Sequence, residues 1–119
     1  MTIEADVVRD YFKAFNDHDL DAVVANFTDD AVILGSDGTR QEGIEEIRRH
    51  YANTFAMFPD GHCDLLQACG SDGTAAAESV FTGKRPGHNH EHRMTGAELL
   101  TIRDAKISQL RDYHSASGT

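Results

Sequence analysis

The sequence has no apolar run long enough to cross a membrane, and cationic residues are scarce in it. It holds 11 Lys and Arg against 20 Asp and Glu, which gives a net charge of −9. This balance would repel nucleic-acid phosphates, and no basic face interleaved with aromatic residues offsets it. Because no signal-peptide pattern is present either, we expect a cytoplasmic protein with no membrane or nucleic-acid partner.

Cysteine is also scarce, and the two that occur, Cys63 and Cys69, stand on one predicted strand. At the rise of a strand they lie about 20 Å apart, too far for a disulfide, so both are interpreted as free thiols. The sequence also lacks a phosphate-binding loop, a dinucleotide-binding glycine motif and a nucleophile elbow. These absences favour chemistry without a cofactor.

Amphipathic helices are predicted in the first half of the chain. Apolar residues recur at helical spacing from Val7 to Phe15 and again from Leu20 to Phe27, and Asp19 precedes the second stripe as a capping residue. A short apolar run at residues 31–34, closed by the turn 35–38, is typical of a strand. A third helix is predicted from about residue 43 to residue 58.

The second half of the chain alternates polar and apolar residues as strands do. Strands are predicted at residues 62–70, 74–83, 92–102 and 106–114, with turns at 71–73 and 103–105. Helices followed by a run of antiparallel strands predict an α+β fold, and 119 residues suit a single domain over residues 1–119.

Two stretches of the sequence carry a family resemblance. Residues 7–33 and 42–55 resemble the first half of bacterial ketosteroid isomerases, and residues 92–114 resemble the last strand pair of SnoaL-like polyketide cyclases. Both families belong to the superfamily named after nuclear transport factor two. The resemblance implies a cone-shaped, curved antiparallel sheet wrapped around three N-terminal helices. This scaffold hosts isomerases, cyclases, epoxide hydrolases, dehydratases and binding proteins, so the resemblance is specific for the fold rather than the reaction.

The implied fold has an internal pocket between the concave face of the sheet and the first and third helices. A bulky apolar lining suits a small hydrophobic molecule with one or two polar groups. The residues expected in that lining are Phe15, Phe55, Phe58, Val80, Met94, Leu100 and Leu110.

The resemblance carries over to particular residues only in part. Tyr11 falls on the tyrosine that donates a hydrogen bond to the enolate oxygen in ketosteroid isomerases, and Glu98 falls on its protonated carboxylic-acid partner. The isomerase base aligns with Gly35, which cannot move a proton. Asp37 is near enough for a local shift of the alignment to replace it.

The cyclases carry an acid/base carboxylate on the final strand, and the matching position here is Asp112. Strand alternation places Glu98 and Asp112 near one another across the turn at 103–105, and His114 shares the face of Asp112. Glu78 is expected to join them from the preceding strand. Carboxylates gathered over an apolar pocket raise one another's pKa toward the range of a general acid or base.

Structural roles are the alternative for each of these residues. A tyrosine on a core-facing stripe, as Tyr11 is, packs with its hydroxyl satisfied about as often as it catalyses. His114 near a strand end is often simply solvated, whereas an inward Asp112 is costly unless used or paired.

The tract His88-Asn89-His90-Glu91-His92 offers three imidazoles to a metal such as zinc or nickel. It follows a polar hairpin tip and shows no supporting partners, so a solvated loop is the favoured interpretation and no metal site is predicted. His92, nearest the pocket by alternation, is a candidate ligand contact.

Two function classes follow. The first is a cofactor-independent acid/base enzyme, an isomerase, cyclase or dehydratase, acting on a small lipophilic carbonyl compound. The second is a non-catalytic domain that binds a small hydrophobic ligand in the same pocket. Epoxide opening ranks lower, because no inward Arg paired with a second Asp accompanies Asp112.

A second copy of the chain is the expected protein partner. The family commonly dimerises through the outer face of the sheet. Alternation predicts that an apolar set of residues lies on that face and needs cover: Cys63, Leu65, Cys69, Leu99 and Ile107.

Overall fold

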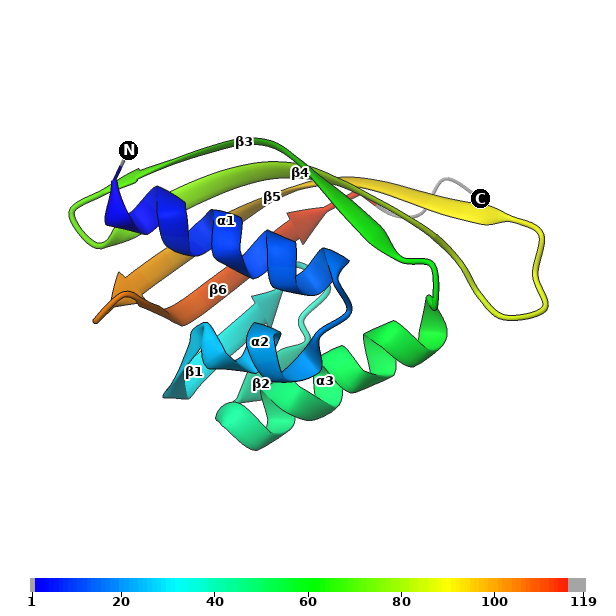
Figure 1. The fold of residues 1–119 in the computed structure, drawn as a ribbon, viewed down its shortest axis with the longest axis horizontal. Coiled ribbons are helices and arrows are strands. Elements are labelled where there is room, and N and C mark those ends of the chain that lie inside the picture. Colours follow the sequence, from blue (N-terminus) through cyan, green and yellow to red (C-terminus); the bar gives the residue numbers. More distant parts are fainter. Residues whose placement is uncertain (1, 116–119) are drawn as a thin grey trace.

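The computed structural model describes residues 2–115 and contains helices on one side of a curved six-stranded sheet (Figure 1). The strand order across the sheet is β2-β1-β6-β5-β4-β3. The elements are α1 (Ile3–Asn16), α2 (Leu20–Ala25), β1 (Phe27–Gly35), β2 (Arg40–Glu42), α3 (Ile44–Met57), β3 (His62–Ser71), β4 (Thr74–Lys84), β5 (Glu91–Arg103) and β6 (Lys106–His114).

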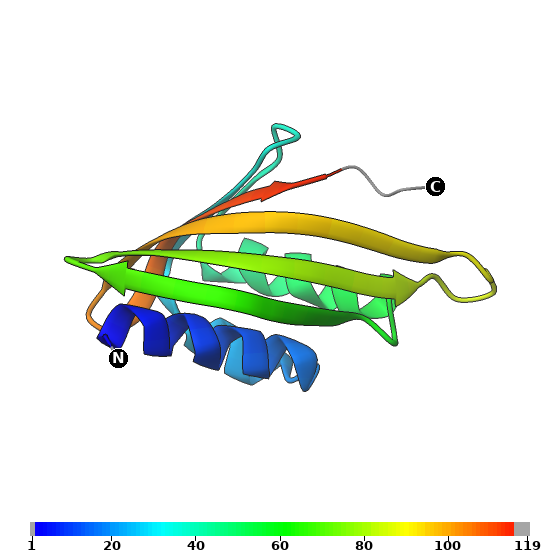
Figure 2. The same cartoon turned by 90° about the horizontal axis from the view of Figure 1, so that it is seen from above.

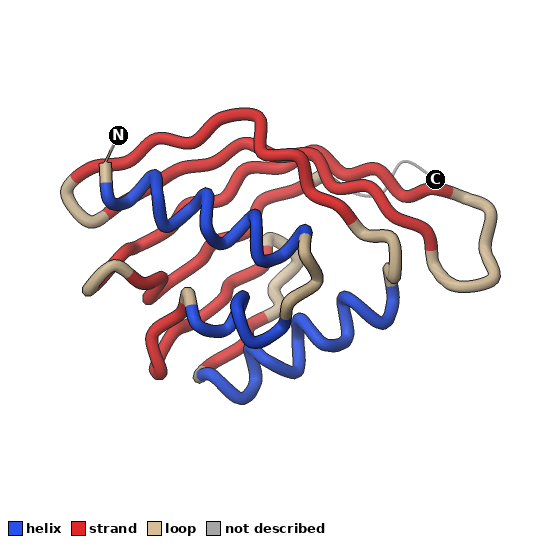
Figure 3. Tube along the Cα trace, in the orientation of Figure 1, coloured by secondary structure: helices blue, strands red, loops and turns tan. Residues whose placement is uncertain are grey.

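The α+β fold predicted from the sequence is confirmed, with one difference in the sheet. All neighbouring strands run antiparallel except β1 and β6, which pair in parallel. The tube in Figure 3 shows all three helices gathered on the same side of these strands. Seen from above, α1 runs along β3, and α3 lies behind the strands (Figure 2).

The helices form where capping and burial coincide. The Thr2 side chain accepts a hydrogen bond from the Ala5 N–H at the start of α1, and Asp19 does the same for the Ala22 N–H at the start of α2. The apolar stripe of α1 packs on the sheet, so that Val8 is fully buried. The turn between α1 and α2 is fixed by His18, whose ring nitrogen lies 2.6 Å from the Gly61 carbonyl oxygen.

The second helix is shorter than its apolar pattern predicts. It ends at Ala25, and Phe27 begins β1 instead, where it pairs with Ile107 of β6. The Ile107 N–H donates to the Asn26 carbonyl at 2.7 Å, so strand pairing begins immediately after the helix. The three-residue strand β2 was not predicted, because residues 40–42 are polar and lie at the sheet edge.

The predicted outer face of the sheet is wrong at three positions. Ile107 is fully buried, and Cys63 and Leu65 pack against the core. A register shift between Leu65 and Gln67 breaks the alternation of β3, and a second shift after Thr101 breaks it between β5 and β6. The large apolar residues that β3, β5 and β6 expose are Leu66, Leu99 and Tyr113.

Within residues 2–115, no helix is long and apolar enough to span a membrane.

Candidate active site

A pocket of about 230 Å³ lies between the sheet and helices α1 and α3. It draws side chains from all elements except α2 and β2, and its lining is mostly aromatic and aliphatic. The lining residues are Tyr11, Phe12, Phe15, Ile33, His50, Tyr51, Thr54, Phe58, Cys63, Ser79, Phe81, Met94, Gly96, Glu98, Leu110, Asp112 and His114.

Two tyrosines meet in this pocket. Tyr11 lies on the buried stripe of α1 and Tyr51 on the buried face of α3, and their hydroxyl oxygens are 2.6 Å apart. Burial raises the pKa of Tyr11 well above its ordinary value, and burial likewise raises the pKa of Tyr51. Both phenols therefore keep their protons at neutral pH, so the pair can donate one hydrogen bond within itself and one outward.

Glu98 is the most deeply buried carboxyl group of the pocket, with 8% of its surface exposed. The Ser79 hydroxyl donates to Glu98 Oε1 at 2.7 Å, whereas Oε2 is buried with no hydrogen-bond partner among residues 2–115. Burial raises the pKa of Glu98 from 4.5 to about 7, because the charged form is poorly solvated there. This group can therefore gain or lose a proton near neutral pH.

Asp112 lies directly opposite Glu98 in the antiparallel pair of β5 and β6. Its Oδ1 is 3.2 Å from His114 Nδ1, and both side chains are about one-third exposed. Residues opposite one another in a ladder project to the same face, so both carboxyl groups reach the pocket. The pocket thus combines a buried carboxyl group and a more accessible one.

His50 of α3 adds an imidazole to the same wall. Burial lowers the pKa of His50 from 6.5, so the ring is neutral at pH 7, even though Asp112 and Asp37 act in the opposite direction. Burial also raises the pKa of the Cys63 thiol to about 12, which keeps it protonated and unreactive. Neither residue adds a positive charge to the pocket at neutral pH.

The predicted catalytic residues Tyr11, Glu98, Asp112 and His114 are brought together in this one pocket. The predicted lining residues Phe15, Phe58, Met94 and Leu110 are there as well. Leu100 lies deeper in the core, outside the lining.

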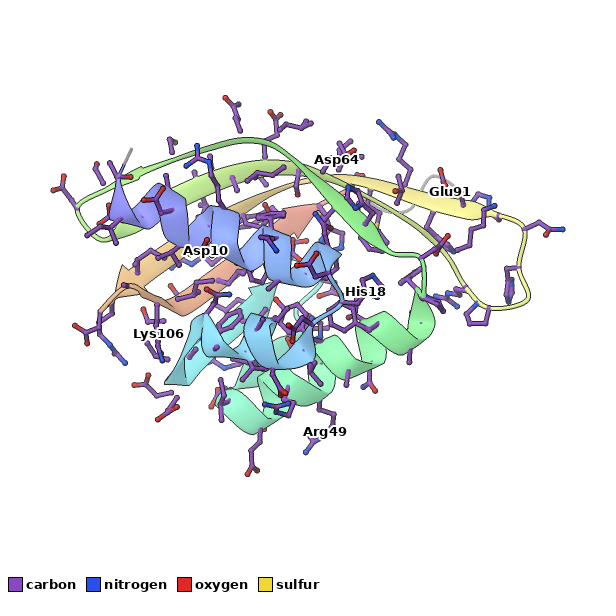
Figure 4. The ribbon with its side chains drawn as sticks, viewed as in Figure 1. Asp10, His18, Arg49, Asp64, Glu91 and Lys106 are labelled. Atoms are coloured by element: carbon purple, nitrogen blue, oxygen red, sulfur yellow. The ribbon has the colours of Figure 1, made fainter. Side chains whose placement is uncertain are left out.

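Two expected ligand contacts lie just behind the lining. Phe55 stacks on His18, with ring centroids 4.6 Å apart, and packs 5.4 Å from Phe15. Figure 4 shows His18 at the end of α1, beside α3. His92 packs against Phe58 with a centroid distance of 5.5 Å. Both therefore support lining residues and do not themselves line the pocket.

The predicted inward orientation of Glu78 and Val80 is wrong. Ala77 is the residue opposite Glu98, and Ser79 is opposite Gly96, so the inward residues of β4 are the odd-numbered ones. Glu78 and Val80 project from the other face, and the Glu78 carboxylate accepts a hydrogen bond from Gln67 at 3.1 Å. Because of the loop between β4 and β5, odd-numbered residues of β4 share a face with even-numbered residues of β5.

Among the described residues the histidine tract does not form a metal-binding group of three, although the rings of His90 and His92 are in contact, with centroids 5.1 Å apart. His88 and His90 are exposed in the loop before β5, while His92 faces inward on β5. In the described part of the chain, no group of three or more His, Cys, Asp or Glu side chains is arranged to hold a metal ion.

Asp37 does not take the place of the missing isomerase base. Its carboxylate accepts hydrogen bonds from the backbone and hydroxyl of Thr39 at 3.0 and 2.7 Å, and these bonds lower its pKa. It is exposed and lies outside the pocket lining. A side chain at Gly35 would collide with this turn, because an added Cβ would lie 2.6 Å from Asp37 Oδ1.

Sequence reasoning missed several polar lining residues, among them Tyr51, Ser79 and His50. Helical spacing places Tyr51 on the apolar face of the third helix, and only the structure shows that its hydroxyl meets that of Tyr11. Ser79 was missed because the even-numbered residues of β4 were predicted to face inward, whereas the odd-numbered ones do. His50 precedes Tyr51 on a helix, where a polar residue is usually solvated.

Comparison with known proteins identifies the fold independently. The model of the SnoaL-like domain family matches residues 8–110. The comparison with curated proteins finds no match.

Solved structures resemble this one over most of their length. A protein with a ketosteroid isomerase-like fold from Catenulispora acidiphila, in complex with trimethylamine, is 24% identical, with a TM-score of 0.85 over 92% of this chain and 85% of that one. A proposed polyketide cyclase from Sinorhizobium meliloti is 26% identical, with a TM-score of 0.76 over 90% of this chain and 93% of that one. An LEH-like epoxide hydrolase of M. tuberculosis is 15% identical, with a TM-score of 0.84 over 95% of this chain and 83% of that one.

These findings confirm the resemblance carried by the sequence. Because the family model covers most of the chain, the protein belongs to the SnoaL-like domain family.

Proposed function

We propose that this protein is a cofactor-independent acid/base enzyme that moves a proton on a small lipophilic carbonyl compound, in an isomerase-, cyclase- or dehydratase-like reaction. The observation that carries the proposal is the pairing of Glu98 with Asp112 over an apolar pocket. The pKa of Glu98, raised by burial to about 7, suits proton transfer at neutral pH.

The tyrosine pair supplies the electrophilic half of this reaction. When a proton leaves the carbon beside a carbonyl group, negative charge develops on the carbonyl oxygen. A hydroxyl of Tyr11 or Tyr51 donates a hydrogen bond to that oxygen, and because both phenols are buried the bond is stronger than it would be in water.

The carboxyl pair supplies the proton transfer. Asp112, in its ionised form, takes the proton from carbon, and the C–H electron pair moves into the enolate. Protonated Asp112, which is about one-third exposed and can exchange its proton with water, then gives a proton to a carbon of the substrate, so that the enzyme is restored. His114, 3.2 Å from Asp112, orients the carboxylate.

The lining supports a small substrate. A pocket of about 230 Å³ is below the roughly 300–1,000 Å³ usual for drug-sized ligands. No Arg or Lys occurs among the described lining residues, so an Asp-Arg-Asp arrangement for epoxide opening has no support.

The experiment that tests the proposal does not require the natural substrate to be identified. The protein is incubated in D₂O with a panel of small cyclic ketones and enones, and NMR follows the loss of the protons beside the carbonyl group. Wild-type protein is expected to accelerate exchange for at least one compound. Asp112→Asn is expected to slow it by about a hundredfold or more, because the proton acceptor is lost.

Glu91→Gln is the matched control, because Glu91 is exposed at the start of β5 and lies outside the pocket. Exchange that survives in Asp112→Asn would contradict the assignment of the base. The absence of exchange across the panel, with the compounds shown to bind, would favour a binding protein.

A second candidate function is ligand binding without catalysis. The observation that favours it is the neighbour from Catenulispora acidiphila, which is in complex with trimethylamine, a molecule with no carbonyl group. The pocket of the present protein has the size and the aromatic lining for a ligand of this kind.

The assembly proposed for this enzyme is a cytoplasmic homodimer that covers the outer face of the sheet. Leu66, Leu99 and Tyr113 are between 45% and 57% exposed there. A reducing compartment would keep Cys63 and Cys69 as the free thiols that they are here. Light scattering on the purified protein tests the dimer, and a monomer mass would contradict it.

A further inference from the structure

The pocket lining contains acidic side chains but no Lys or Arg among the described residues. Two carboxyl groups, Glu98 and Asp112, face the space, while no Arg or Lys of the described residues lines it. Figure 4 shows the labelled cations Arg49 and Lys106 pointing outward from the body of the protein. Any positive charge that balances the carboxyl groups must therefore come from a proton or from a ligand.

The buried carboxyl group has one oxygen without a hydrogen-bond partner among the described residues. Glu98 is more than nine-tenths buried, and its Oε2 has no partner among residues 2–115, although Oε1 accepts a bond from Ser79. A buried acceptor without a partner destabilises the folded protein, and more so when it is charged. A group with positive charge beside Oε2 would remove this destabilisation.

Aromatic rings enclose the same space from several directions. Tyr51 lies between Tyr11 and Phe15 with centroid distances of 6.0 and 6.2 Å and interplanar angles of 71° and 78°. Phe58 and Phe81 form another steep pair, at 5.1 Å and 75°. These pairs pack edge to face, and all five residues line the pocket, so its walls supply aromatic rings of the kind that attract ammonium groups.

We propose that the pocket selects a small lipophilic cation, a tertiary or quaternary ammonium group, held between Glu98 and the aromatic lining. This inference rests on the proposed function for the location of the site and adds the substrate class: an ammonium compound, with the carbonyl group elsewhere in the same molecule. A neutral ligand would satisfy the rings but would leave Glu98 without a counter-charge, whereas Asp112 already has His114 beside it. An anionic ligand would be repelled.

The bound cation is expected to displace a proton. With a positive charge beside Oε2, the ionised form of Glu98 is stabilised and its pKa falls below about 7. Binding near neutral pH therefore releases part of a proton, and affinity rises with pH through this range. The other titratable groups around Glu98 are Asp112 and His114 of β6, Tyr11 of α1, His50 and Tyr51 of α3, and Cys63 of β3.

The first experiment compares two ligands of the same shape by calorimetry. Choline carries a permanent positive charge, and 3,3-dimethylbutan-1-ol replaces its nitrogen by carbon. Wild-type protein is expected to bind choline at least about tenfold more tightly than the alcohol. Glu98→Gln keeps the shape and the oxygen facing Ser79, and is expected to remove most of this preference, whereas Glu91→Gln at the exposed start of β5 keeps it.

The second experiment needs no variant and so does not depend on the folding of Glu98→Gln. Choline binding to wild-type protein is measured at neutral pH in two buffers that differ in ionisation enthalpy. Because choline does not titrate, the difference gives the protons released by the protein. About half a proton per choline is expected at neutral pH, where Glu98 is about half protonated, and almost none well above its pKa.

The outcomes separate this inference from the proposed function. Equal affinity for choline and the alcohol, or choline binding without proton release, would overturn the cation site. If neutral ketones still exchange their protons in that case, the proposed function stands with an uncharged substrate. A choline preference that persists in Glu98→Gln would also overturn the proposal, because the charge would then be bound elsewhere.

Discussion

Replacing Glu98 by Gln is expected to stabilise the protein at alkaline pH and to change its stability little under acidic conditions. Burial raises the pKa of Glu98 from 4.5 to about 7, so between these values the folded state holds a proton that the unfolded state has lost. The stability of the wild type therefore falls as pH rises through this window. Below it both states are protonated, and above it both are ionised.

The size of the effect follows from the same two values. A rise from 4.5 to about 7 corresponds to about 3 kcal/mol of free energy of unfolding, lost as Glu98 is forced to ionise in place. Within the window the slope is about 1.4 kcal/mol for each pH unit. Gln keeps the oxygen that accepts the Ser79 hydroxyl and carries no charge, so it avoids this loss.

Urea unfolding of wild type and Glu98→Gln at a series of pH values, from about 5 to about 8, measures the effect. The difference between the two proteins is the useful quantity, because other groups contribute equally to both. His50, whose pKa is lowered by burial, is the main one of these, and it destabilises both proteins as pH falls. Glu91→Gln, at an exposed position, is the control for removing one negative charge.

Parallel curves for wild type and Glu98→Gln would refute this reasoning. They would mean that Glu98 keeps an ordinary pKa in the folded protein, and that the pocket solvates its charge. A difference that grows toward acidic pH would refute it as well, since that sign belongs to a carboxyl group whose pKa is lowered on folding.

Ser79→Ala is expected to raise the pKa of Glu98 above about 7, because the Ser79 hydroxyl stabilises the carboxylate; an NMR titration of the Glu98 side-chain carbon checks this. Tyr51→Phe is expected to cost about 1–2 kcal/mol in urea unfolding, because it leaves the Tyr11 hydroxyl without its partner at 2.6 Å. Thr2→Ala is expected to lower stability by about 1 kcal/mol in the same assay, because the Ala5 N–H at the start of α1 loses its cap.

Glu98 and Asp112 show what could be predicted of the site from sequence. Both stand on strands joined by the tight turn at residues 104–105, and such a turn sets the pairing of the residues that follow it. Alternation from that turn places both side chains near one another on the two strands. Counting residue by residue from the turn would pair Glu98 with Arg111, and the register shift near Thr101 is what brings Asp112 opposite Glu98. The helix stripe that carries Tyr11 is equally local, since it depends only on helical spacing.

Glu78 and Val80 show what could not be predicted. Their strand is joined to β5 by the loop at residues 85–90, and a loop of that length permits either alternation. The register has Ala77 opposite Glu98, and this turns Glu78 and Val80 to the outer face. Packing of the whole sheet decides between the two arrangements, so the inward position of Ser79 also required the structure.

The position of Gly35 connects the resemblance to the chemistry of this chain. Gly35 aligns with the isomerase base, and in the structure it pairs with Asp112 across the parallel strands β1 and β6. The Ser36 N–H also donates to the Asp112 carbonyl oxygen at 3.0 Å, which fixes the two backbones together. Paired residues of neighbouring strands project to the same face, so Asp112 presents its carboxylate beside the site that Gly35 leaves without a side chain. A base at Asp112 would therefore act on the same region of the pocket from the adjacent strand, which is why losing a carboxylate at residue 35 does not by itself argue against proton transfer here.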